Sequence, residues 1–161
     1  MRVPWASLRT LLLLGVLLAL YAVSEPGLVP AGAVFEVERE PVAGPFSRCG
    51  RGRFHACVVD GDTIKLGDRR IRLLGIDAPE IFEPACAREA DLGEQATAEL
   101  LRQLNRGSVV MVRDWRDGVD RYGRDLRRLV RVEAGRDVDI AGALIEKGLA
   151  RRFVGYDPGW C

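Results

Sequence analysis

The sequence predicts a small α+β domain built around a β-barrel and preceded by an apolar leader. Three observations support this fold class. Two stretches with alternating apolar residues, at 57–66 and 69–76, are joined at Gly67. Two stretches with apolar residues three and four positions apart indicate helices at 88–106 and 138–147. A chain of 161 residues suits one such domain together with a leader.

The N-terminal segment has the pattern of a secretory signal peptide. Arg2 and Arg9 precede an apolar run over residues 11–23. This run is shorter than the roughly 17–25 residues that span a bilayer. We therefore expect residues 1–24 to be a signal peptide, cleaved after Ser24 or after Ala33, and the protein to be periplasmic or extracellular. An uncleaved segment that anchors the chain in a membrane is the alternative.

Residues 25–48 predict a linker, because they contain four prolines and show little apolar periodicity. The folded domain is accordingly placed at 49–161. Removing residues 1–24 takes Arg2 and Arg9 from the 24 basic residues and leaves 22 against 23 acidic ones. No bulk positive charge then attracts polyanions, so any affinity for phosphate depends on local clusters.

The stretch CVVDGDTIKL, residues 57–66, places Asp60 and Asp62 on the same face as the apolar side chains of a strand. We interpret it as one continuous strand in which Gly61 marks a bulge or a close backbone approach. A hairpin turn at 60–61 is the alternative. Burying an unpaired carboxylate costs several kcal/mol, so the two acids need a neutralising partner unless the strand breaks.

The second strand leads into RIRLLGIDAPE, residues 70–80. We expect Asp62 and Asp77 to lie on paired neighbouring strands and to converge on one cation. Carboxylate ligands without a nearby histidine favour a hard ion, calcium or magnesium, over zinc. An EF-hand is excluded, because Ile71 occupies the twelfth position counted from Asp60, where that loop needs a glutamate.

The helix at 88–106 has apolar residues repeated at i+4, namely Ala96, Leu100 and Leu104. Short apolar strands follow at 108–112 and 126–132. The helix at 138–147 has Asp137 as its expected N-cap and Gly148 at its end.

The segment 113–131 contains seven arginines and four aspartates. Alone, this composition is typical of a solvated hairpin with many ion pairs. Within it, DRYGR at 120–124 combines a turn, an aromatic ring and two guanidinium groups. Arginine binds phosphate oxygens through paired donors, and tyrosine can stack on a nucleotide or hydrogen-bond to it.

All four cysteines lie beyond the leader, at Cys49, Cys57, Cys86 and Cys161. An even number in an exported chain favours disulfides. Of the three possible pairings we expect Cys49 with Cys57, which closes a short loop, and Cys86 with Cys161, which holds the chain end near the segment after Glu80. A zinc site that uses these thiols with His55 is the weaker alternative, because no C-x₂-C spacing is present.

Five motifs, VVDGDTIKL, IRLLGIDAPE, GEQATAEL, DRYGRDL and LIEKGLA, occur in the order and spacing of the staphylococcal-nuclease-like (thermonuclease) family. The chain resembles this family over residues 57–156. The resemblance implies a five-stranded OB-fold barrel with packed helices. It also implies calcium-dependent hydrolysis of phosphodiester bonds in DNA and RNA, with magnesium as the less favoured ion.

The resemblance also implies roles for single residues. It implies a metal shell, transition-state donors and a group that activates water. The metal ligands are Asp62, Asp77 and the backbone carbonyl of Ala78, the donors are Arg72 and Arg124, and the group that activates water is Glu80.

Three further positions correspond to substrate contacts. Arg121 and Tyr122 match positions that approach the nucleotide phosphate, and Tyr156 matches one that contacts the nucleotide. Val154 replaces a second nucleotide-contacting tyrosine, and Ala78 replaces a threonine whose carbonyl, not its side chain, binds the metal. The nucleic-acid substrate is the partner implied, and no protein partner is; we expect a monomer.

Two other interpretations remain. A non-catalytic OB-fold module would bind nucleic acid without cleaving it, and an envelope-tethered domain would be purely structural. Both metal carboxylates and both catalytic arginines are present, which favours the enzyme.

Overall fold

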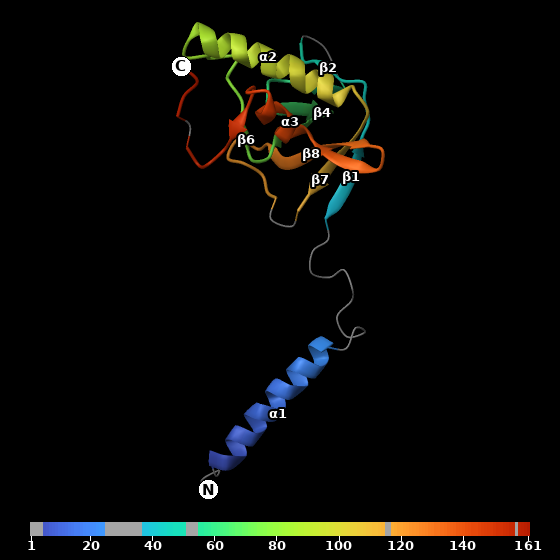
Figure 1. The fold of residues 1–161 in the computed structure, drawn as a ribbon, viewed down its shortest axis with the longest axis vertical. Helices are drawn as coiled ribbons and strands as arrows, with labels where there is room; N and C mark the ends of the chain where they lie inside the picture. The colour runs from blue at the N-terminus through green and yellow to red at the C-terminus, as the bar shows by residue number, and fades with distance from the viewer. Residues whose placement is uncertain (1–4, 25–36, 51–54, 115–116, 157) are drawn as a thin grey trace. The chain divides into compact units, whose positions relative to one another are not determined.

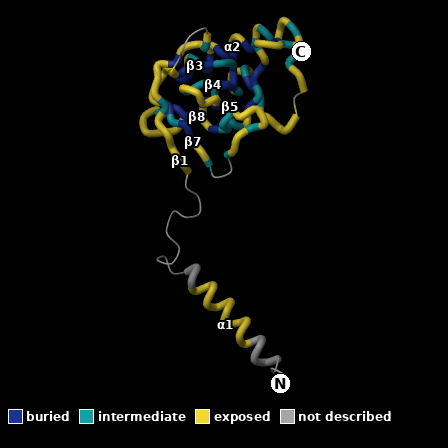
Figure 2. The backbone as a smooth tube through the Cα atoms, turned by 180° about the vertical axis from the view of Figure 1, so that it is seen from behind, coloured by how far each residue is buried: buried dark blue, intermediate teal, exposed yellow. Residues whose placement is uncertain are grey.

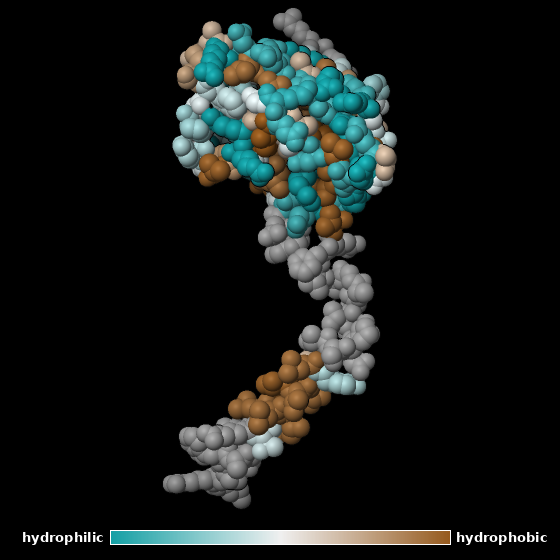
Figure 3. Space-filling view, in the orientation of Figure 1, coloured by the Kyte–Doolittle hydropathy of each residue, from teal (hydrophilic) through white to brown (hydrophobic). Residues whose placement is uncertain are grey.

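The computed structural model describes residues 5–24, 37–50, 55–114, 117–156 and 158–161. The chain divides into two compact units, Met1–Glu36 and Val37–Cys161. The first contains helix α1 (Trp5–Ser24), whose side chains from Thr10 to Tyr21 are exposed and mostly apolar (Figure 3). Among the residues described, no helix is both long enough and apolar enough to cross a membrane. The predicted cleavage after Ala33 and the 25–36 part of the linker fall outside the described residues.

The second unit is a curled mixed sheet with two helices against it (Figure 1). The strands run β1-β7-β8-β5-β4-β3-β2 across the sheet, β9 pairs with β8, and β6 and β10 form a separate pair. In chain order the elements are β1 (Glu38–Val42), β2 (Ser47–Arg48), β3 (Ala56–Val58), β4 (Thr63–Leu66), β5 (Arg69–Leu73), β6 (Ile76–Asp77), α2 (Ala87–Leu104), β7 (Ser108–Arg113), β8 (Asp125–Glu133), β9 (Arg136–Asp139), α3 (Ile140–Glu146) and β10 (Arg151–Arg152). The α+β class is confirmed: β3, β4, β5, β8 and β7 form the five central strands, and β1, β2 and β9 extend the sheet.

The core lies between the concave face of the sheet and the two helices, where Figure 2 shows the buried tube in dark blue. The expected stripe of α2 is buried, with Leu100 completely inaccessible. It packs with Ile64, Ile71, Leu129 and Leu144, which are also completely inaccessible. Burial of each such side chain stabilises the fold by about 1.5–3 kcal/mol.

The predicted linker is wrong over residues 37–48, which belong to the folded domain. Strand β1 pairs antiparallel with β7, and Pro41 is tolerated because β1 is an edge strand. Phe46 is buried, its N–H donates to Asn105 Oδ1 at 2.9 Å, and its carbonyl accepts from Asn105 Nδ2 at 2.9 Å. Pro41, a residue type common in linkers, therefore lies in an edge strand here.

The continuous strand expected at 57–66 is also wrong, because the chain reverses there. β3 and β4 pair antiparallel, with Val58 opposite Ile64. A hydrogen bond closes the turn: the backbone N–H of Asp62 donates to Asp60 Oδ1 at 3.1 Å. The close backbone approach expected at Gly61 is confirmed: a Cβ there would lie 2.7 Å from the Cβ of Ala96. The turn therefore lies against α2 at Gly61.

The second predicted strand breaks after β5. Gly75 has a φ of +80°, and the chain then enters β6, where Asp77 pairs with Arg151 of β10. Asp62 and Asp77 therefore do not lie on paired strands, as the sequence had suggested. They are nevertheless close to each other, because Arg72 Nη2 lies 2.8 Å from Asp62 Oδ2 and 3.7 Å from Asp77 Oδ1.

Helix α3 begins later than predicted, because residues 136–139 form β9. Asp139 is the N-cap, and its carboxylate accepts from the N–H of Gly142 at 3.2 Å. The expected cap, Asp137, instead forms an ion pair with Arg39 at 2.9 Å. Gly148, with a φ of +69°, follows the helix as predicted.

Both predicted disulfides are confirmed. Cys49 is bonded to Cys57 and Cys86 to Cys161, so each of the four cysteines is paired. The zinc alternative is thereby excluded, because it needs free thiolates.

Candidate functional site

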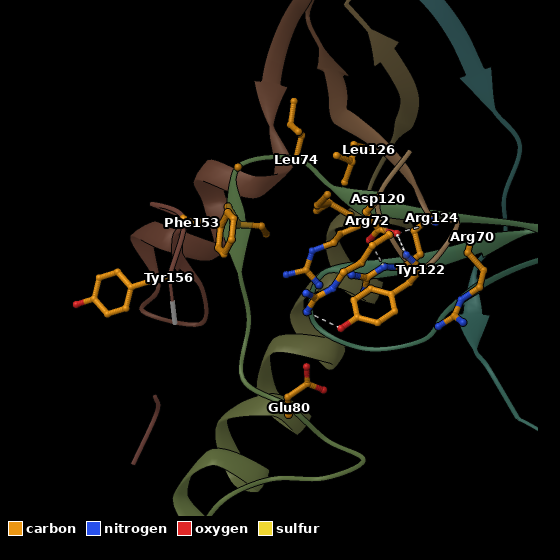
Figure 4. Close-up of a pocket in the computed structure, with 15 residues that line it drawn as sticks. Arg70, Arg72, Leu74, Glu80, Asp120, Tyr122, Arg124, Leu126, Phe153 and Tyr156 are labelled. Atoms are coloured by element: carbon orange, nitrogen blue, oxygen red, sulfur yellow. Dashed lines mark hydrogen bonds and ion pairs between the residues drawn. The ribbon is translucent and has the colours of Figure 1, made fainter. Parts of the chain in front are cut away.

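A cleft with a volume of about 840 Å³ gathers side chains from four separate segments (Figure 4). They come from β5, from the stretch through β6 to Glu80, from the loop before β8, and from the segment after β10. Of the predicted residues, the cleft is lined by Arg72, Glu80, Arg121, Tyr122, Arg124 and Tyr156. The apolar side chains of Phe153 and Leu74 complete its walls, and Arg70 adds a cation that the sequence did not indicate.

The loop before β8 is folded around the carboxylate of Asp120. Its Oδ1 accepts from the backbone N–H of Tyr122 at 2.8 Å and of Arg124 at 2.9 Å, and its Oδ2 accepts from Arg124 Nε at 2.7 Å. Burial opposes ionisation, but these hydrogen bonds outweigh it and hold the pKa of Asp120 below its usual value. Arg124 Nη1 also lies 3.4 Å from the hydroxyl of Thr63. Arg124 is therefore held in place before any substrate binds.

Arg72 lies between the two predicted metal carboxylates. Its Nη1 and Nη2 donate to Asp62 Oδ1 at 2.9 Å and Oδ2 at 2.8 Å, and Nη2 lies 3.7 Å from Asp77 Oδ1. Asp62 is only 4% exposed and also accepts from the hydroxyl of Thr63 and the N–H of Ala78. Burial first, and the charge of Asp60 second, raise the pKa of Asp62 to about 7 in spite of Arg72.

Asp77 is held from its other side by the C-terminal part of the chain. Its Oδ2 accepts from Arg151 Nε at 3.1 Å, from Arg151 Nη2 at 2.9 Å and from Trp160 Nε1 at 3.2 Å. Sequence analysis missed both partners. Only the predicted bond between Cys86 and Cys161 indicated that the residue next to Cys161 would lie near this site.

Glu80 faces the arginines across the cleft, with its carboxylate pointing toward them in Figure 4. Burial, and then the nearby carboxylates led by Asp60, raise the pKa of Glu80 although Arg72 lowers it. A higher pKa makes Glu80 a better proton acceptor near neutral pH. The buried Glu89 of α2 shapes the loop, because it accepts from the N–H groups of Glu80 at 3.4 Å and Ala85 at 2.7 Å.

The predicted substrate-contacting residues line two different walls. Arg121 Nη2 donates to the hydroxyl of Tyr122 at 2.7 Å, and its guanidinium lies 4.8 Å from the ring centre. Tyr156, 67% exposed, lies across the cleft and points away from this pair (Figure 4). Val154 is exposed but does not line the cleft, whereas Phe153 does. Phe153 was not predicted, because it matches no motif position.

The donor set fits a hard cation. Within the described part of the chain, no three His, Cys, Asp or Glu side chains cluster closely enough to hold a metal. The carboxylates of Asp62 and Asp77 are close together, because both lie near Arg72 Nη2. An ion here would be bound by these two carboxylates and by a backbone oxygen such as that of Ala78. Oxygen ligands alone suit calcium or magnesium. A cation would also stabilise the ionised form of Asp62, which burial otherwise disfavours.

A family model described as staphylococcal nuclease homologue matches residues 70–159, more than half of the chain. The match contains Arg72, Asp77, Glu80 and Arg124, and it begins after Asp62. No match was found among curated proteins. The family and the curled sheet together give this domain a nuclease-type, nucleic-acid-binding fold. The chain thus belongs to the family of staphylococcal nuclease homologues.

Proposed function

We propose that this protein is an exported, calcium-dependent nuclease that hydrolyses phosphodiester bonds of DNA and RNA. The observation that carries the proposal is the convergence of Arg72, Glu80 and Arg124 on one cleft. The two carboxylates Asp62 and Asp77 adjoin the cleft through Arg72. A module that only binds nucleic acid has no need of a proton acceptor beside two fixed guanidinium groups.

The arginines bind and stabilise the phosphate. Attack on a phosphodiester builds negative charge on the non-bridging oxygens, and Arg72 and Arg124 can each donate to them. Arg124 is already oriented by Asp120. Neither guanidinium serves as a general acid, because arginine does not deprotonate in proteins.

Glu80 orients a water molecule and takes its proton. The water oxygen forms the new bond to phosphorus, and the proton passes to the Glu80 carboxylate. The bond from phosphorus to the leaving oxygen breaks, and that oxygen keeps the electron pair and takes a proton from solvent water. The raised pKa of Glu80 favours this transfer. The shape of the loop around Glu80 depends on Glu89.

Asp62, Asp77 and the carbonyl of Ala78 would hold the calcium ion, with magnesium as the less favoured alternative. When bound, the ion supplies positive charge close to the phosphate oxygens. Arg72 is engaged by both carboxylates in the structure. With its carboxylate partners neutralised in this way, the guanidinium of Arg72 could turn from Asp62 and Asp77 and donate to the phosphate.

The remaining cleft residues bind the substrate on either side of the reacting phosphate. Arg121 and Tyr122 contact phosphate on one wall, and Tyr156 contacts the nucleotide on the other. The two disulfides indicate an oxidising environment. Together with the leader at 1–24, they support export. We propose a monomer whose partner is its nucleic-acid substrate.

The proposal is tested by incubating the purified chain with labelled single- and double-stranded DNA and with RNA. Cleavage is expected in calcium and is expected to stop when a chelator is added. Glu80→Gln should bind calcium and DNA as the wild type does but cleave far more slowly. Binding of DNA without any cleavage would instead identify a non-catalytic module.

A further inference from the structure

We propose that Trp160 and Arg151 are positioning residues for Asp77, and that the Cys86–Cys161 disulfide completes the metal site by holding them there. The inference rests on the proposed function, because it assigns Asp77 to the metal. It makes the calcium affinity of the protein depend on whether the thiols of Cys86 and Cys161 are oxidised to the disulfide.

The two oxygens of Asp77 have separate surroundings. Oδ2 receives all three hydrogen bonds from Arg151 and Trp160, at 2.9–3.2 Å. Oδ1 faces Arg72, whose Nη2 lies 3.7 Å away and also binds Asp62. Hydrogen bonds to Oδ2 thus orient the carboxylate, while Oδ1 is the oxygen that would bind the proposed ion. Metal-binding carboxylates are commonly oriented by such hydrogen bonds from outside the metal shell.

Trp160 and Arg151 also support each other. The Arg151 guanidinium lies over the indole ring, 4.3 Å from its centre. Arg151 Nη1 donates to the carbonyl of Gly159 at 2.8 Å. Arg151 itself is fixed by pairing of β10 with β6, directly opposite Asp77. These contacts support the ring in the position from which its Nε1–H reaches Asp77.

The disulfide joins this cluster to the start of helix α2. Cys161 follows Trp160, and its partner Cys86 is the N-cap of α2, so the C-terminus lies at that end of the helix (Figure 1). Residues 158–161 form neither strand nor helix. Reduction would release the segment from α2 and lower the probability that Trp160 stays on Asp77. The loop from Glu80 to Cys86 is tied to the same helix by Glu89.

The test is calorimetric titration of the full chain with calcium, for the wild type and three variants that circular dichroism shows to be folded. Trp160→Phe keeps a ring over Arg151 and removes only the Nε1 donor. Cys86→Ala with Cys161→Ala removes the tether. Both are expected to weaken calcium binding, by about 10–100-fold for the double variant, the range found when outer-shell partners are lost. Treating the wild type with a reductant should reproduce the effect.

Cys49→Ala with Cys57→Ala is the matched control, because it removes the other disulfide, which does not touch Asp77. This variant is expected to lose stability but to keep wild-type calcium affinity. The inference is overturned if Trp160→Phe and the Cys86/Cys161 variant bind calcium as tightly as the wild type or more tightly. Equal weakening in the control also overturns it. If the wild type binds no calcium, the proposed function fails as well, so the two failures are distinguishable.

Discussion

Asp62→Asn is expected to stabilise the calcium-free protein at alkaline pH. The side chain is 4% exposed, and its pKa is raised from the usual 3.8 to about 7, chiefly by burial and then by Asp60. The folded state therefore holds the proton more tightly than the unfolded chain does. Stability from this group is present below about pH 4 and is lost as the pH rises to about 7.

The size of the effect follows from the two pKa values. A rise from 3.8 to about 7 corresponds to at most about 4 kcal/mol, at about 1.4 kcal/mol for each tenfold change in proton affinity. The amide keeps only one acceptor oxygen for Arg72 and Thr63, so part of this gain is lost. We expect the variant to exceed the wild type by about 1–3 kcal/mol at pH 8, and by much less at pH 5.

Urea unfolding with a chelator present, at pH 5 and at pH 8, measures both differences. Asp68→Asn is the control, because it removes the charge of an exposed carboxylate in the turn after β4. Calcium added at pH 8 should stabilise the wild type and the control but not Asp62→Asn. The reasoning is refuted if the wild type gains stability relative to Asp62→Asn between pH 5 and pH 8.

Three other variants test separate parts of the account. Arg124→Ala should lower the cleavage rate by about 10²–10³-fold without changing calcium affinity. Arg128→Ala, an exposed arginine on β8, should leave the rate unchanged. Gly61→Ala should cost about 1–3 kcal/mol in urea unfolding, because the new Cβ would lie 2.7 Å from that of Ala96. Glu99 has its pKa lowered to about 2, chiefly by hydrogen bonds from Arg102. Glu99→Gln should thus cost about 1–3 kcal/mol at neutral pH in urea unfolding, a difference that disappears as the pH falls from about 4.5 to about 2.

The fold class and most of the cleft could be predicted from the sequence, because they depend on local patterns. The i+4 stripe of α2, the turns at Gly67 and Gly148 and the motif DRYGR each carry their own signal within a few residues. Both disulfides were also predicted, although spacing alone does not fix which cysteines pair.

The errors arose where local signals compete. The sequence Asp60-Gly61 fits either a turn or a strand. The close approach of Ala96 to Gly61 is a tertiary contact, which local sequence does not indicate. Likewise, Pro41 is compatible with a linker and with an edge strand. The pairing of β1 with β7 shows that it lies in an edge strand. The cluster of Asp77 with Trp160 depends on a contact across 83 positions of the chain, for which the sequence has no periodic signal.

The most direct test of the central claim is to measure DNA cleavage and calcium binding together, in the wild type and in Asp77→Ala. In the wild type, the cleavage rate should rise with calcium and level off over the concentrations at which calorimetry shows the ion binding. In Asp77→Ala, the calcium affinity and the cleavage should both be lost. Cleavage at the wild-type rate by Asp77→Ala, or by the wild type in a chelator, would contradict the account.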